Sequence, residues 1–135
     1  MRKQNLKAIC PCQSQNILAN CCGPYLEYRE LPQTPELLMR SRYTAFFLKN
    51  FDYIKKTMRG KALENFSLKE ALNQSKNSQW ISLEIIKSSI EENKNAGTVE
   101  FKAQYKSYGK IYSMHENSQF EYYEGKWYYV SGEFL

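Results

Sequence analysis

The four cysteines of this 135-residue chain, Cys10, Cys12, Cys21 and Cys22, all fall between residues 10 and 22. Thiols clustered in so short a segment are typical of a metal site, whereas the cysteines of a secreted disulfide framework are spread over the fold. Four thiolates supply the soft, tetrahedral donor set that Zn²⁺ prefers, and they leave no coordination position open. The spacing therefore predicts one structural zinc ion per chain.

Two other interpretations of the cysteines stay open, a pair of disulfides and four inert thiols. Cys21 and Cys22 are adjacent, and Cys10 and Cys12 are separated only by Pro11. Near neighbours reach the Cα separation and torsion of a disulfide badly, and cytosolic thiols stay reduced. Metal binding is therefore the favoured interpretation.

Helices are expected after this cysteine segment. Thr34, Pro35 and Glu36 form a good helix start, with a capping hydroxyl, a proline in the first turn and an acidic group at the positive helix end. That helix should reach about residue 50, and a second short helix should cover residues 51–58. A capping box at residues 67–70 predicts a third.

From Trp80 onward the pattern changes to strands, which we expect at residues 80–90, 99–105, 110–123 and 126–131. A polar turn should join the first two strands over residues 92–97, and Glu124-Gly125 reads as a two-residue hairpin turn. Helices followed by an antiparallel meander indicate an α+β fold, with helices packed on one face of a curved sheet.

The hairpin fixes which residues share a face of the sheet. If Tyr123 pairs with Lys126, Phe120 lies opposite Tyr129, and counting by twos places Glu116 on the same face as Phe120. The helices are the elements available to cover that face. A carboxylate there is costly unless it is paired or hydrogen-bonded, so we expect an arginine of the first helix to approach it.

These considerations give seven candidate cavity residues: Arg40, Arg42, Trp80, Glu116, Phe120, Trp127 and Tyr129. In an open cavity Glu116 could act as a general base and an arginine could bind an anion. In a filled one the same residues form an ion pair and core. No catalytic residue is assigned, because no Ser-His-Asp set, phosphate loop or nucleotide fingerprint is present.

The net charge of +5 is spread along the chain, with short basic excesses at residues 2–7 and 55–61. Such dispersion predicts only weak, non-specific binding to nucleic acid. No run of about 18 apolar residues is present, so we expect no membrane span. The basic first seven residues have no apolar segment behind them, which predicts no secretory signal and a cytoplasmic protein.

Two resemblances follow from these residues. The Cys-Pro-Cys sequence, eight residues and Cys-Cys resemble the SEC-C zinc knuckle, except that Gln13 and Gln15 stand where that motif usually has glycine. The remainder resembles the YchJ-like (UPF0225) family, whose middle domain has an NTF2-like fold. The matching segments are residues 38–46, 52–53, 115–120 and 125–130, with Trp80 and Leu83.

Taken together, the resemblances imply a zinc knuckle over residues 1–30 and an NTF2-like α+β domain over residues 31–135, the latter with a core of its own. No reaction is established for the family. The favoured hypothesis is an interaction module rather than an enzyme, and its knuckle is expected to dock on a protein or ribosomal partner. The alternatives are ligand binding or catalysis in the cavity through Glu116 and an arginine, and weak nucleic-acid binding.

Overall fold

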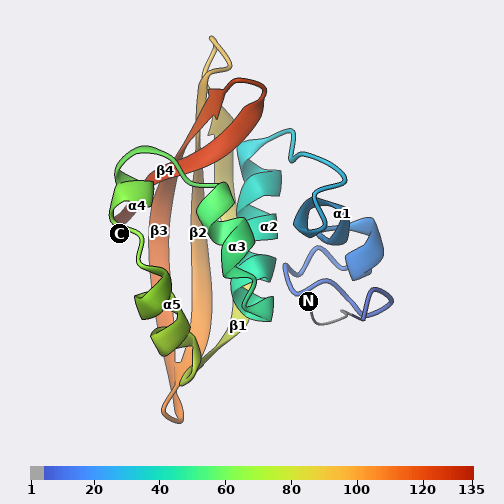
Figure 1. Ribbon diagram of the computed structural model, residues 1–135, viewed down its shortest axis with the longest axis vertical. Helices are drawn as coiled ribbons and strands as arrows, with labels where there is room; N and C mark the ends of the chain where they lie inside the picture. The colour runs from blue at the N-terminus through green and yellow to red at the C-terminus, as the bar shows by residue number, and fades with distance from the viewer. Residues whose placement is uncertain (1–4) are drawn as a thin grey trace.

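The computed structural model describes residues 5–135, so Arg2 and Lys3 of the basic N-terminal segment lie outside the described residues. Helical elements come first along the chain and four strands follow (Figure 1). The helical elements are η1 (Leu18–Asn20), α1 (Gly23–Leu26), α2 (Pro35–Leu48), α3 (Phe51–Lys56), α4 (Gly60–Glu64) and α5 (Leu68–Ser75). The strands are β1 (Ser78–Ile90), β2 (Ala96–Ser107), β3 (Lys110–Tyr123) and β4 (Lys126–Phe134).

The helix starts are where the capping residues predict them. The Thr34 hydroxyl accepts a hydrogen bond from the Leu37 amide at 3.1 Å, and Ser67 caps α5 in the same way. Helix α2 ends where Lys49 takes the left-handed conformation at φ 63°. The predicted second helix ends at Lys56, two residues early, and the short α4 was not predicted.

The strands form one antiparallel sheet in the order β1-β2-β3-β4. The predicted hairpin register is confirmed, because Phe120 lies opposite Tyr129 and Tyr123 opposite Lys126. Strand β4 runs three residues beyond its predicted end at residue 131. A register shift lies between Gln119 and Phe120, and the pairing continues past it to Phe134 opposite Glu116, which alternation alone could not reveal.

Helices α2 and α3 cover one face of the sheet, and the cysteine segment lies against α2 (Figure 1). We expected the sheet and helices to have a core separate from that segment. The structure differs: Cys10, Cys12 and Leu18 belong to the same buried cluster as Leu38 and Ala45. The two parts of the chain therefore share one apolar interior.

None of the helices in residues 5–135 is both long enough and apolar enough to cross a membrane.

Candidate metal centre and its surroundings

The sulfur atoms of the four cysteines gather at one point. All four Sγ atoms lie within 4.8 Å of one another, and Cys12, Cys21 and Cys22 make neighbouring Sγ–Sγ distances of 3.5 and 4.0 Å. A tetrahedral zinc site with Zn–S bonds of about 2.3 Å has sulfurs about 3.8 Å apart. The pairs are much too long for disulfides, whose S–S bond is about 2.05 Å, and all four cysteines are free. The donor set therefore fits a metal ion.

Local hydrogen bonds hold this cluster in place. The Cys10 amide donates to the Asn16 carbonyl at 2.8 Å, and the Cys21 amide donates to the Leu18 carbonyl at 3.1 Å. Gly23 follows directly, and a Cβ there would lie only 2.7 Å from the Leu18 carbonyl oxygen. Glycine is therefore required where α1 passes η1 closely.

The loop between the two cysteine pairs has the left-handed backbone conformation that glycine favours, although it contains no glycine. Gln13 and Gln15 have φ angles of 65° and 75°, in the left-handed region that disfavours residues with a Cβ. The Gln13 side chain also bonds to the body, because its Oε1 accepts from the Leu83 amide of β1 at 3.0 Å. The two glutamines thus preserve the loop that the motif's glycines favour.

Hydroxyl groups complete the surroundings of the sulfurs. Ser14 Oγ lies 3.0 Å from Cys21 Sγ, and Thr44 Oγ1 of α2 lies 3.5 Å from Cys10 Sγ. Toward a thiolate a hydroxyl is the donor, and such second contacts orient metal ligands. Thr44 is fully buried, so α2 contributes directly to the centre.

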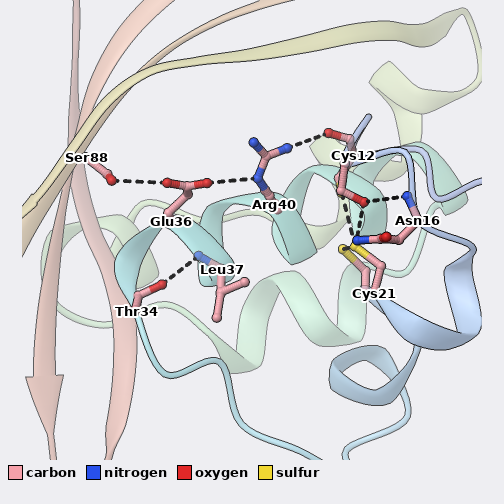
Figure 2. Close-up of polar contacts among 10 residues, drawn as sticks. Cys12, Asn16, Cys21, Thr34, Glu36, Leu37, Arg40 and Ser88 are labelled. Atoms are coloured by element: carbon pink, nitrogen blue, oxygen red, sulfur yellow. Dashed lines mark hydrogen bonds and ion pairs between the residues drawn. The ribbon is translucent and has the colours of Figure 1, made fainter.

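Arg40 joins the cysteine segment to α2 and the sheet (Figure 2). Its Nη1 donates to the Cys12 carbonyl at 2.9 Å and its Nε to Glu36 Oε2 at 3.1 Å. The other oxygen of Glu36 accepts from Ser88 of β1 at 3.2 Å. Arg40 therefore serves the cysteine segment, and its prediction as a cavity residue beside Glu116 is wrong.

The thiols influence one another strongly. Hydrogen bonds from Cys10 and then Cys22 hold the pKa of the Cys12 thiol far below its usual range. Hydrogen bonds with Cys10 and then Cys12 raise the pKa of Cys22 far above its usual range, and burial raises that of Cys21 to about 11. A divalent ion would stabilise all four thiolates.

Glu116 does lie on the helix-facing side of the sheet, and Arg42 is near enough for a charge interaction with it but forms no ion pair. It is only 8% exposed, and one carboxylate oxygen accepts from Ser118 Oγ at 2.5 Å. Strand β4 passes over it closely enough that a Cβ on Gly132 would lie 2.7 Å from Glu116 Oε2. Among the ion pairs within residues 5–135, none includes Glu116. The carboxylate is a packed, hydrogen-bonded group.

Arg42 is buried and bonds elsewhere. Its Nη1 donates to the Ile54 carbonyl at 2.9 Å and to Thr57 Oγ1 at 2.6 Å, at the end of α3. Its guanidinium lies 4.6 Å from the centre of the Tyr129 ring. Burial lowers the pKa of Arg42 to about 10. The predicted direct pair with Glu116 is therefore wrong, because α3 satisfies the guanidinium.

A cavity of about 700 Å³ lies between the C-terminal end of α2, helix α5 and the first residues of β1. Of the seven cavity candidates, only Trp80 lines it. Phe120 and Trp127 are buried in the core instead, and Tyr129 packs edge-on against Phe120. Sequence reasoning missed Lys49, Tyr105 and Met114 as lining residues; the alternation of β2 indicates the inward direction of Tyr105 but not the cavity.

A four-stranded antiparallel sheet covered by helices, with a clustered Cys-x-Cys and Cys-Cys pair beside them, defines an NTF2-like α+β protein with a SEC-C motif. The family model described as YchJ, middle NTF2-like domain, matches residues 34–132. The chain belongs to this YchJ-like family. Both the recognised family and the predicted fold class are thereby confirmed.

Individual relatives agree. A UPF0225 protein from Shewanella sp. (strain MR-7) is 40% identical over 130 residues, covering 91% of this chain and 79% of the relative. The solution structure of a SEC-C motif containing protein from Rhodopseudomonas palustris superposes with a TM-score of 0.85 at 37% identity, over 93% of this chain and 98% of that one. A crystal structure of a SEC-C motif containing protein from Psychrobacter arcticus gives 0.81 at 28% identity, over 95% and 84%.

Proposed function

We propose that the chain is a cytoplasmic zinc-binding interaction module, in which one structural zinc ion fixes the knuckle and the knuckle docks on a protein partner. The observation that carries the proposal is the convergence of four sulfur atoms within 4.8 Å. Four soft donors in a closed set favour zinc over oxygen-seeking cations such as Mg²⁺. A closed shell leaves no position for a reacting water, so the ion's role is structural.

The surface of the knuckle supports the docking role. Ile9 is 62% exposed and Leu6 is also exposed, with the charged Lys7 between them. Apolar side chains left in water on a segment fixed by metal and hydrogen bonds are suited to contact with another protein. The partner's chemistry would be an apolar surface with acidic groups near it, as a ribosomal protein could offer.

Metal content is the first test. Protein purified without added metal should contain one zinc ion per chain by elemental analysis, and replacing Cys10 and Cys12 with serine should abolish it. Zinc well below one per chain, with native thiols freely titratable, would refute the zinc assignment. A matched Ser14→Ala variant should keep the full zinc content, because Ser14 contacts Cys21 without being a ligand.

Docking requires a second experiment, for which the chain offers a matched pair of isoleucines. Ile9 is 62% exposed on the knuckle and Ile111 is 63% exposed on β3. A photoreactive residue at position 9 should form adducts with one protein identified by mass spectrometry, and these adducts should disappear when zinc is stripped. Equal adducts at positions 9 and 111, or adducts indifferent to zinc, would contradict docking through the knuckle.

A further inference from the structure

A second candidate site lies at the C-terminal end of α2. We propose that the cavity of about 700 Å³ between α2, α5 and the β1–β3 end of the sheet binds an aromatic monoanion, such as an aryl carboxylate. The volume falls within the range of about 300–1,000 Å³ common to small-molecule pockets. This inference is independent of zinc and of docking through the knuckle.

Aromatic rings form the apolar part of the cavity. The Trp80 ring lies 5.2 Å from that of Tyr105 and 6.2 Å from that of Phe46, measured between ring centres and at tilted angles. All three residues line the cavity and are half-buried, together with Met114. Tilted rings and a thioether present faces and edges that suit a flat aromatic guest.

The charge of the residues that line the cavity favours a negatively charged ligand. Among the described residues that line the cavity, Lys49 alone is charged, and the other polar groups include the amides of Asn73 and Asn77. A neighbouring shallower depression shares Lys49 and adds Lys69 and Lys76. A carboxylate at the mouth would therefore meet an ammonium group in a basic surround, while amides could donate to its second oxygen.

The wall formed by α5 provides a route of entry. Neither α4 nor α5 contains a fully buried residue, and Leu63, Leu68 and Leu72 are all exposed. Few buried apolar contacts mean a low local free energy of opening. Small displacements of α5 would therefore admit a ligand without disturbing α2 or the sheet.

The two tryptophans of the chain make the test internally controlled. Trp80 lines the cavity, whereas Trp127 is buried and donates its indole N–H to the Gln33 carbonyl at 3.2 Å. In a ¹⁵N-resolved NMR titration with 2-naphthoate, the indole signal of Trp80 should shift and saturate while that of Trp127 stays in place. Equal movement of both signals, or of neither, would overturn the proposal.

Charge selectivity is tested with a matched pair of lysines. Lys49 and Lys94 are both exposed and both left-handed, with φ angles of 63° and 60°, and asparagine tolerates that conformation. Lys49→Asn should weaken 2-naphthoate binding about tenfold, as expected for loss of one charge-assisted hydrogen bond. The affinity for neutral 2-naphthamide should not change.

Lys94→Asn should leave both affinities unchanged, because Lys94 lies in the turn between β1 and β2, outside the cavity lining. An equal loss in the two variants would show that net charge, not the cavity, attracts the anion, and would overturn the site. Unchanged 2-naphthoate binding in Lys49→Asn would overturn the assignment of the cation.

Discussion

Gln13 and Gln15 show how a residue can keep a backbone conformation that its type disfavours. Both lie in the left-handed region, where a residue with a Cβ costs roughly 1–2 kcal/mol relative to glycine. Only Gln13 has a visible compensation, since its side chain accepts the hydrogen bond from the Leu83 amide. At that amide the pairing of β1 with β2 has just shifted register, so the glutamine supplies an acceptor beside an irregular stretch.

The two positions should therefore respond differently to glycine. We expect Gln15→Gly to raise the free energy of unfolding by about 1 kcal/mol, because it removes the left-handed strain. Gln13→Gly should be near neutral, since the loss of a hydrogen bond worth about 1 kcal/mol offsets the same gain. Urea denaturation of both variants beside the parent measures the difference. Equal stabilisation by both would show that the Gln13–Leu83 contact contributes nothing.

At the scale of elements, α2 packs against α1, α3 and strands β1, β2 and β4. Its first turn bonds to β1 through Glu36 and Ser88, and Arg40 one turn later bonds to the Cys12 carbonyl. Thr44, a further turn along, lies against Cys10 Sγ. Because these side chains recur every four residues, they form one stripe along α2, which bonds to β1 at its start and faces the cysteine segment further along.

Arg40→Met should expose how much this stripe stabilises the fold. The variant keeps the side chain's length but leaves the Cys12 carbonyl without its donor, so we expect a loss of about 1–3 kcal/mol. Arg29→Met is the control, because the Arg29 side chain is 61% exposed against 22% for Arg40 and pairs only with Glu27. An exposed pair contributes about 0–1 kcal/mol. Chemical denaturation of the two variants should separate them, and similar losses would contradict the bracing role.

At the scale of the whole molecule, the cysteine segment and the body share one apolar interior, so loss of the metal should affect the stability of both. Cys10, Cys12 and Cys22 are buried within the same cluster as Leu38 of α2 and Val99 of β2. Without a bound cation, thiols in such surroundings lose the interactions that hold the segment in place. The boundary between knuckle and body at residue 30 remains a prediction, but their stabilities should be linked.

Stripping the metal should therefore weaken the body as well as the knuckle, if zinc is bound as proposed. We expect the free energy of unfolding to fall by at least about 3 kcal/mol, because a tightly bound ion stabilises only the folded state. Hydrogen exchange followed by mass spectrometry should then accelerate in residues 96–107 of β2 together with residues 5–30. Restored zinc should reverse both changes. Faster exchange confined to residues 5–30 would show that the body folds independently.

The sequence by itself determined the features that depend on near neighbours. The cysteine spacing predicted a common metal site, the capping residues located the start of α2, and alternation with the Glu124-Gly125 turn predicted the pairing of Phe120 with Tyr129. Each signal acts over a few residues, through backbone hydrogen bonds or the period of a strand, so distant packing hardly alters it.

Only the tertiary structure decided the partners of long side chains and the location of the cavity. Arg40 and Arg42 are two residues apart on one helix, yet one bonds to Cys12 and the other to the end of α3. An arginine can extend in several directions, and the nearest buried acceptor is set by which elements pack there. The cavity combines Lys49, which follows α2, with Trp80 of β1 and Tyr105 of β2. No local sequence pattern predicts that these residues lie together, because their proximity follows from how the helices and the sheet pack.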